Sequence, residues 1–267
     1  MKNISPTAVG TALTIPRTLV SSLLNLYDYP HPSKSGMVIR GYDKSHALRT
    51  AKMCIAVARD LEHPADRVED YQIACLLHDL GRAGLETKLF GAIWSWARAH
   101  GIPTRPAEWR ALHQKTAYGK ETAAFISLYR TRLEQSGITM HKWACEQVEM
   151  RLGFARRMRR QLRRVKPTLK NLNINWKPWM SKVTLYYYYP EKLANGAPWV
   201  RELGEILVAC EQLEAYSNRR RGKDYYTRGQ ESFAHAFQYL DRLVANGQLS
   251  GNVVKRVKVL TRSEEHT

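Results

Sequence analysis

The chain has 267 residues and carries 42 lysine and arginine side chains against 24 aspartate and glutamate side chains, so its formal net charge is +18 at neutral pH. Hydrophobic residues make up 44% of it, which is ordinary for a globular protein and excludes a disordered chain, because such a chain is poorer in aliphatic and aromatic residues. The charge favours an anionic partner: a nucleic acid, a nucleotide, an acidic protein or a membrane surface.

Hydrophobic periodicity predicts helices along almost the whole chain. In order, we expect them over residues 18–27, 44–62, 66–80, 88–98, 115–136, 141–165, 200–217, 229–245 and 252–260. Residues 167–182 lack this periodicity and predict an irregular segment. Alternating Val/Ile runs bounded by turns are absent, so a sheet is not expected. The sequence therefore predicts an all-α fold, built as a single helical bundle domain.

The domain boundaries follow from composition. We expect an N-terminal arm with a short helix over residues 1–41 and a helical domain over residues 42–261, with a basic insertion at about 140–185. The last six residues, 262–267, resemble the in-frame translation of a common sequencing adapter and are expected to be a non-native tail; a genuine polar tail is the alternative.

The cysteines and the apolar runs indicate the compartment. The four cysteines form no C-x-x-C motif and each lies in an apolar helical context, which predicts buried free thiols and a reducing, cytoplasmic location. The longest apolar runs, such as residues 206–210, are too short to span a bilayer, so no membrane span is expected.

A metal site is indicated by three residues on two successive predicted helices. His78 and Asp79 are adjacent at the end of an apolar helix, just before Gly81, and His46 lies beside the apolar stripe of the preceding helix. Imidazole nitrogen and carboxylate oxygen suit Zn, Mn, Fe or Mg. Taken alone, the His-Asp pair also fits a surface dipeptide and His46 a satisfied core histidine. Their combination favours metal ligands.

This H…HD arrangement resembles the HD superfamily of metal-dependent phosphohydrolases, whose signature is H…HD…D on an all-helical domain. It resembles most the HD-GYP branch, whose active members hydrolyse cyclic di-GMP. Residues 45–61 (SHALRTAKMCIAVARDL), 74–85 (ACLLHDLGRAGL) and 204–223 (GEILVACEQLEAYSNRRRGK) are similar to motifs of that branch. The resemblance covers residues 42–90 and 186–260 and weakens between them.

The resemblance implies a divalent metal centre of one or two ions (Fe, Mn, Mg or Zn). It implies the metal ligands His46, His78, Asp79, His113 and Glu211, the last in place of an aspartate of the family. Asp79 would bridge metals or orient water. His141 has a suitable spacing to replace a lost ligand.

The resemblance also implies catalytic and phosphate-binding roles. Arg82 stands in place of a motif lysine and would act with Asp79 in catalysis and bind the substrate phosphate. Arg49 is a second phosphate-binding candidate. Arg219 and Arg220, in the loop after Glu211, are others, with a solvated basic loop as the alternative.

Two family features are missing. The paired histidines before the G-Y-P loop fall at Tyr189 and Pro190, and the loop itself shrinks to Gly196-Ala197-Pro198. These departures imply a smaller centre than that of active members.

The expected function is therefore a metal-dependent phosphohydrolase. It would be a phosphodiesterase that acts on a phosphorylated small molecule or a cyclic dinucleotide, such as cyclic di-GMP, by metal-activated water. The alternative is a catalytically degenerate regulatory module that binds a nucleotide or a protein partner.

A second feature has no counterpart in the family. Residues 151–170 contain nine lysines and arginines and no acid. Six of the arginines wrap a predicted helix around an apolar stripe of Phe154, Met158, Leu162 and Val165, and tryptophans follow at 176 and 179. Basic residues beside aromatics can bind nucleic acid. An acidic protein partner and a merely solvated face are the alternatives.

Overall fold

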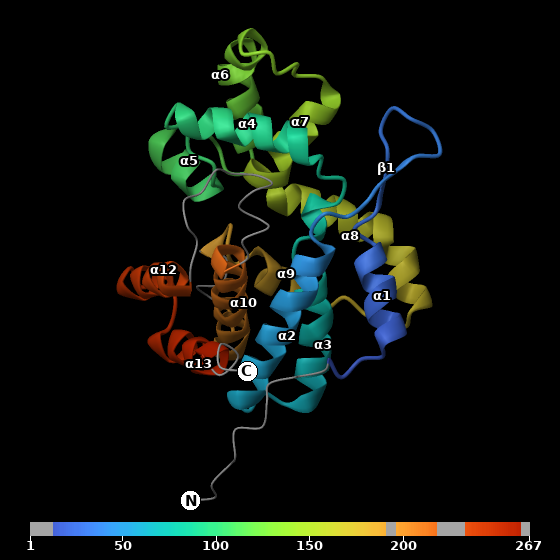
Figure 1. Ribbon diagram of the computed structural model, residues 1–267, viewed down its shortest axis with the longest axis vertical. Coiled ribbons are helices and arrows are strands. Elements are labelled where there is room, and N and C mark those ends of the chain that lie inside the picture. The colour runs from blue at the N-terminus through green and yellow to red at the C-terminus, as the bar shows by residue number, and fades with distance from the viewer. Residues whose placement is uncertain (1–12, 191–195, 218–232, 263–267) are drawn as a thin grey trace, which may run out of the picture.

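The computed structural model describes residues 13–190, 196–217 and 233–262, and these residues form an all-α fold in a single domain, as predicted. Figure 1 shows the arrangement of the helices. They are α1 (Arg17–Asn25), α2 (Lys44–Asp60), α3 (Ala65–Leu76), α4 (Thr87–Ala99), α5 (Pro106–Leu112), α6 (Glu121–Gln135), α7 (Lys142–Leu152), α8 (Phe154–Asn171), α9 (Pro178–Leu185), α10 (Pro198–Ser217), α12 (Phe233–Ala245) and α13 (Gly251–Arg262).

Only short elements interrupt the helices. The strands β1 (Tyr29–Pro30) and β2 (Val38–Ile39) pair antiparallel, with Tyr29 opposite Ile39. A 3-10 turn, η1 (Leu80–Arg82), follows α3. No helix in the described part of the chain combines the length and the apolar character that crossing a lipid bilayer requires.

The core consists of two hydrophobic clusters. The larger one joins α1, α2, α3, α8, α9, α10, α12 and α13, and the smaller one joins α4, α5, α6 and α7. Figure 1 shows α4 to α7 gathered at one end of the molecule, with α2, α3 and α10 side by side at the other. The predicted basic insertion, residues 140–185, contributes to the larger core through Met158, Val165 and Leu169 of α8 and through Met180 of α9.

The helix predicted over residues 66–80 ends early, at Leu76, and this matters for the site. His78 and Asp79 lie after the helix, between α3 and η1, where the chain turns. Gly81 allows this turn to sit against α8, because a Cβ atom at Gly81 would lie 2.6 Å from Cε2 of Phe154. The absence of a side chain thus lets α8 pack directly on η1.

The helix predicted over residues 141–165 is two helices that meet at Gly153. A Cβ atom there would lie 2.6 Å from Cγ of Glu149 and 2.7 Å from Oγ1 of Thr122, so only glycine permits this close approach. Contrary to prediction, α8 continues through Pro167 to Asn171. The exposed Pro167 removes one N–H donor from the helix, and its ring crowds the carbonyl four residues earlier, so it interrupts the hydrogen bonding on the solvent side without ending the helix.

Other boundaries also differ from prediction. Helices α5 and α9 were not expected, and α6 begins at Glu121 rather than at residue 115. The first part of the helix predicted over residues 229–245 and the tail from residue 263 lie outside the described residues. All four cysteines are free thiols; Cys54, Cys75 and Cys210 are buried as predicted, whereas Cys145 is only half-buried.

Candidate metal centre

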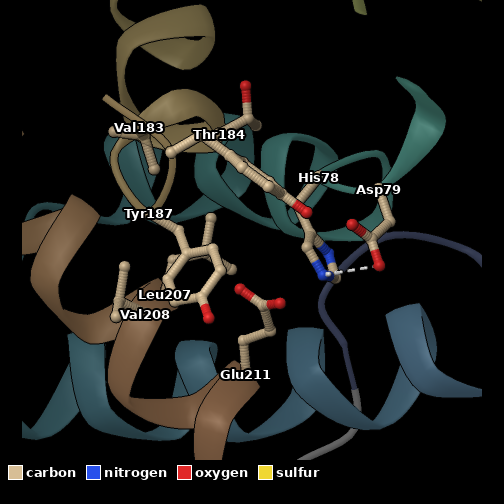
Figure 2. A pocket seen from close by; sticks show the side chains of 9 residues that line it. His78, Asp79, Val183, Thr184, Tyr187, Leu207, Val208 and Glu211 are labelled. Atoms are coloured by element: carbon tan, nitrogen blue, oxygen red, sulfur yellow. Dashed lines mark ion pairs between the residues drawn. The ribbon is translucent and has the colours of Figure 1, made fainter. Parts of the chain in front are cut away.

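Four of the predicted ligands meet in the core. His46 lies in the first turn of α2, His78 and Asp79 follow α3, and Glu211 lies on α10. One ligand atom from each of these residues lies within 4.8 Å of the others, and all four residues are buried. Figure 2 shows Glu211 on α10 facing His78 and Asp79, which are neighbours on the segment after α3. Within the described residues, this is the one group of three or more such side chains that can hold a metal ion.

The hydrogen bonds of the two histidines fix which ring nitrogens face the centre. Nδ1 of His78 lies 2.7 Å from the carbonyl oxygen of Cys75. A carbonyl only accepts, so this nitrogen donates. Nδ1 of His46 donates to the carboxylate of Glu214. In the neutral imidazoles, the Nε2 atoms are therefore the unprotonated nitrogens, which are the ones that can bind a cation.

The distances between these atoms fit a single ion. The two Nε2 atoms lie 3.3 Å apart. Two nitrogens at about 2.05 Å from a tetrahedral metal ion are separated by about 3.3 Å, so the histidines already have the required spacing. Oδ2 of Asp79 lies 3.7 Å from Nε2 of His46 and 3.8 Å from Nε2 of His78. With both Nε2 atoms unprotonated, their lone pairs would face and repel each other, and a cation between them would remove the repulsion.

Asp79 is held in place from two sides. A guanidinium N–H of Arg82 donates to Oδ2 of Asp79 at 3.0 Å, and Nε of Arg82 lies 3.3 Å from Oδ2 of Asp43. The backbone N–H of Asp79 donates to the hydroxyl of Tyr27 at 3.2 Å, and that hydroxyl donates to the carbonyl of Leu76 at 3.0 Å. Burial, and then the charges of Asp79 and Asp43, raise the pKa of Tyr27. Its hydroxyl therefore keeps the proton that it donates.

Sequence reasoning missed Glu214. Its buried carboxylate accepts from His46 and from the guanidinium of Arg49, whose Nε and Nη2 lie 2.7 Å and 2.5 Å from Oε1. The available signal was helical spacing, because Glu214 follows Glu211 by three residues and so lies on the same side of α10. Carboxylates bonded to the second nitrogen of a ligand histidine commonly fix its tautomer and raise its basicity.

A small pocket adjoins the cluster. Figure 2 shows Glu211 and the aromatic ring of Tyr187 facing it, with His78 and Asp79 on the opposite side. The rest of its lining is largely apolar, and burial raises the pKa of Tyr187 and of Tyr188. The cavity volume is about 10 Å³, which is close to the minimum that one water molecule occupies.

The remaining predicted site residues lie elsewhere or have other partners. His113 follows α5 and stacks on Trp109 at 4.1 Å between ring centroids; it is not part of the ligand cluster. His141 accepts a hydrogen bond from the N–H of Ala144 at 3.1 Å and so caps α7. Arg82 and Arg49 contact carboxylates of the site. Arg219 and Arg220 lie outside the described residues.

The structure thus gives an all-α domain with a buried His/Asp/Glu cluster that can hold a metal ion. The chain matches no protein-family model, no curated protein and no solved structure.

Proposed function

We propose that the protein is a metal-dependent phosphohydrolase of the HD type that cleaves a phosphodiester, such as that of a cyclic dinucleotide like cyclic di-GMP. One observation carries the proposal. The Nε2 atoms of His46 and His78, 3.3 Å apart, converge with the carboxylates of Asp79 and Glu211. The order of these residues along the chain follows the H…HD…D signature, with glutamate as the last acid.

Some residues of the site would bind the ion as ligands, and others would position those ligands. His46, His78, Asp79 and Glu211 are its ligands. A divalent ion supplies Lewis acidity, which makes a water molecule acidic enough to attack a phosphoryl group near neutral pH. Glu214 keeps the proton of His46 on Nδ1.

The two candidate phosphate-binding arginines differ in exposure. The side chain of Arg82 is 10% exposed and contacts both Asp79 and Asp43, so it acts as a positioning residue for Asp79. The side chain of Arg49 is 47% exposed although it contacts Glu214. Arg49 therefore offers a solvent-facing cation on the His46 side of the centre, where it would stabilise the charge of an incoming phosphate.

The buried thiols are consistent with the expected location. Cys54, Cys75 and Cys210 are all free and buried in the larger core. Free thiols are typical of a reducing compartment such as the cytoplasm, which is where we place the protein's activity.

A second candidate function follows from how little access a substrate has to the buried ligands. The four ligand residues are at most 8% exposed, and the adjoining pocket is about the size of one water molecule. A dinucleotide would reach the ion only if neighbouring segments move. This observation favours the alternative, a catalytically degenerate regulatory module that binds a nucleotide or a protein partner without turnover.

Hydrolysis assays separate the two functions. The protein is loaded with Mn²⁺, Fe²⁺, Zn²⁺ or Mg²⁺, and cleavage of bis(p-nitrophenyl) phosphate and of cyclic di-GMP is followed. We expect turnover that falls at least about 100-fold in Asp79→Asn. The exposed His100, outside the cluster, provides the control His100→Gln, which should retain full activity. Stoichiometric metal with no turnover of either substrate would support the regulatory function. Equal rates in wild type and Asp79→Asn would refute the assigned site.

A further inference from the structure

The nine basic residues of the segment 151–170 do not form one uniform surface. Arg157 is fully buried; it donates to the carbonyls of Gly81 at 3.1 Å and of Ala83 at 2.8 Å and pairs with Glu146. Arg157 is therefore part of the packing between α8 and η1, and is not available to a partner.

Several other arginines are also occupied. Arg164 donates to the carbonyls of Leu26 at 2.6 Å and of Asp28 at 3.3 Å, which ties α8 to the segment after α1. Arg156 and Arg160 both pair with Glu149. These contacts hold α7 and α8 together and neutralise part of the charge.

Five basic side chains remain. Arg151 is half-buried, and its guanidinium lies 5.3 Å from the centroid of the Trp94 ring. The other four are exposed, and they form no ion pair or hydrogen bond with the described part of the chain: Arg159, Arg163, Lys166 and Lys170. We call them the α8 stripe. Their spacing of four, three and four residues places them within an arc of about 60° and over about 16 Å of helix, at 3.6 residues per turn and 1.5 Å per residue.

The stripe concentrates charge along a line. Neighbouring members are separated by about 4.5–6 Å along the helix axis, which is less than the Debye length of about 8 Å at physiological ionic strength. Four cations this close repel one another, and a polyanion along the stripe relieves the repulsion. Duplex DNA carries one phosphate per about 3.4 Å along each strand. One strand therefore presents about five phosphates over the length of the stripe.

The chemistry of the exposed face distinguishes among polyanions. The aromatic and aliphatic side chains of α8, such as Phe154, Met158 and Val165, are buried in the core. Helices that bind a membrane surface need an exposed apolar face. Single-stranded nucleic acid is bound by stacking on aromatic side chains, and protein interfaces have apolar centres. Exposed aromatic and branched aliphatic side chains are absent from α8, so its exposed face fits none of these three kinds of partner well. The half-buried Trp176 and Trp179 pack against the core.

We propose that the α8 stripe binds the phosphate backbone of double-stranded nucleic acid without reading its sequence. Charge is the main feature that the stripe offers, and phosphate contacts give affinity and position but no base specificity. This proposal is independent of the metal centre, because no member of the stripe is among the ligands of the cluster or the residues lining the pocket.

The test measures binding of the full chain to a fluorescent 20-base-pair DNA duplex, and to an RNA duplex, by anisotropy between 50 and 200 mM salt. If four phosphates are neutralised, log K falls with log salt at a slope of about −3.6, so affinity drops about 150-fold over this range. Replacing all four stripe residues by glutamine should remove most of the binding and reduce the slope nearly to zero.

A matched variant controls for net charge. Lys52, Lys88, Lys142 and Lys255 are exposed on α2, α4, α7 and α13, and their replacement by glutamine removes the same four charges. This variant should keep affinity within a few-fold of wild type. Far-UV circular dichroism verifies that both variants fold. Equal losses in the two variants would overturn the proposal.

Two further probes address the other polyanions. Poly-glutamate and phosphatidylserine vesicles should bind at least tenfold more weakly than the duplex at the same charge concentration. Tighter binding to either of them, or a duplex affinity unaffected by the stripe substitutions, would overturn the assignment to nucleic acid.

Discussion

Replacing Glu214 by glutamine tests whether this carboxylate supports metal binding by His46. The substitution keeps the size of the side chain and an oxygen that can accept from Nδ1 of His46, but it removes the negative charge. Loss of that charge lowers the basicity of the His46 imidazole. Removing the hydrogen-bond partner of a ligand histidine typically weakens metal binding 10- to 100-fold, or by about 1.4–2.8 kcal/mol. Glu214→Ala, which removes the acceptor entirely, should lie at the upper end of this range.

Arg49 complicates the interpretation, because the substitution at Glu214 also removes its partner. Its guanidinium is half exposed and can be solvated by water, so the cost of leaving it unpaired is small. Arg49→Gln separates the two effects and should change metal affinity less than about threefold. The exposed Glu108, whose carboxylate lies 3.7 Å from Arg105, gives the control Glu108→Gln.

Affinity is measured by competition with a metallochromic chelator, and circular dichroism verifies folding. We expect Glu214→Gln to bind the ion with intermediate affinity, between wild type and Glu211→Gln, which loses a ligand. An affinity within twofold of wild type would show that Glu214 does not support His46. A loss as large as that of Glu211→Gln would refute the division between ligand and supporting carboxylate.

Three further predictions concern stability. Removing the ion with a chelator should lower the unfolding temperature of the metal-loaded protein. A free ion concentration of 100 times the dissociation constant adds about 2.7 kcal/mol to the free energy of unfolding. An unchanged melting curve would contradict this prediction. Gly81→Ala should lower the free energy of unfolding, measured in urea, by about 1–3 kcal/mol, because the added Cβ would lie 2.6 Å from the ring of Phe154. The control Gly251→Ala should leave it nearly unchanged, because the nearest atom to the added Cβ would lie 3.7 Å away. Arg157→Met should lower the free energy of unfolding by about 2–4 kcal/mol, because it leaves buried carbonyls without a donor. The control at the exposed Arg159, Arg159→Gln, should lower it by less than about 0.5 kcal/mol. Equal losses in the two variants would contradict the separation of buried and exposed basic residues.

The long helices were predictable, but the short ones were not. Helices α2 and α10 repeat their apolar residues over several turns, and the sequence indicates both of them. Helix α5 has seven residues, of which only Pro106 and Trp109 are buried, and α9 has eight, so neither shows a period in the sequence. Their positions are set by packing against other helices. The break at Gly153 likewise depends on Thr122, which is distant in the sequence.

The candidate site was only partly predictable. His46, His78, Asp79 and Glu211 could be chosen because the family pattern names ligand types at each position. Asp43 could not, because its role depends on Arg82, which it meets across helices. Glu214 had only the weaker signal of its helical spacing from Glu211, and its contact with His46 depends on the packing of α10 against α2. Arg157 is the clearest case on the basic helix. Its partners Gly81 and Ala83 precede it by more than 70 residues, so nothing in the local run of charge indicated that this one arginine is buried.

The most direct test of the metal centre is anomalous diffraction from crystals of the metal-loaded protein, recorded at the absorption edge of the bound ion. We expect one peak at about 2.0–2.3 Å from Nε2 of His46, Nε2 of His78 and a carboxylate oxygen of Asp79, with Glu211 in the same coordination sphere or one water away. The peak should disappear in His78→Gln. A peak away from these residues, or no peak in a protein that binds metal in solution, would contradict the central claim.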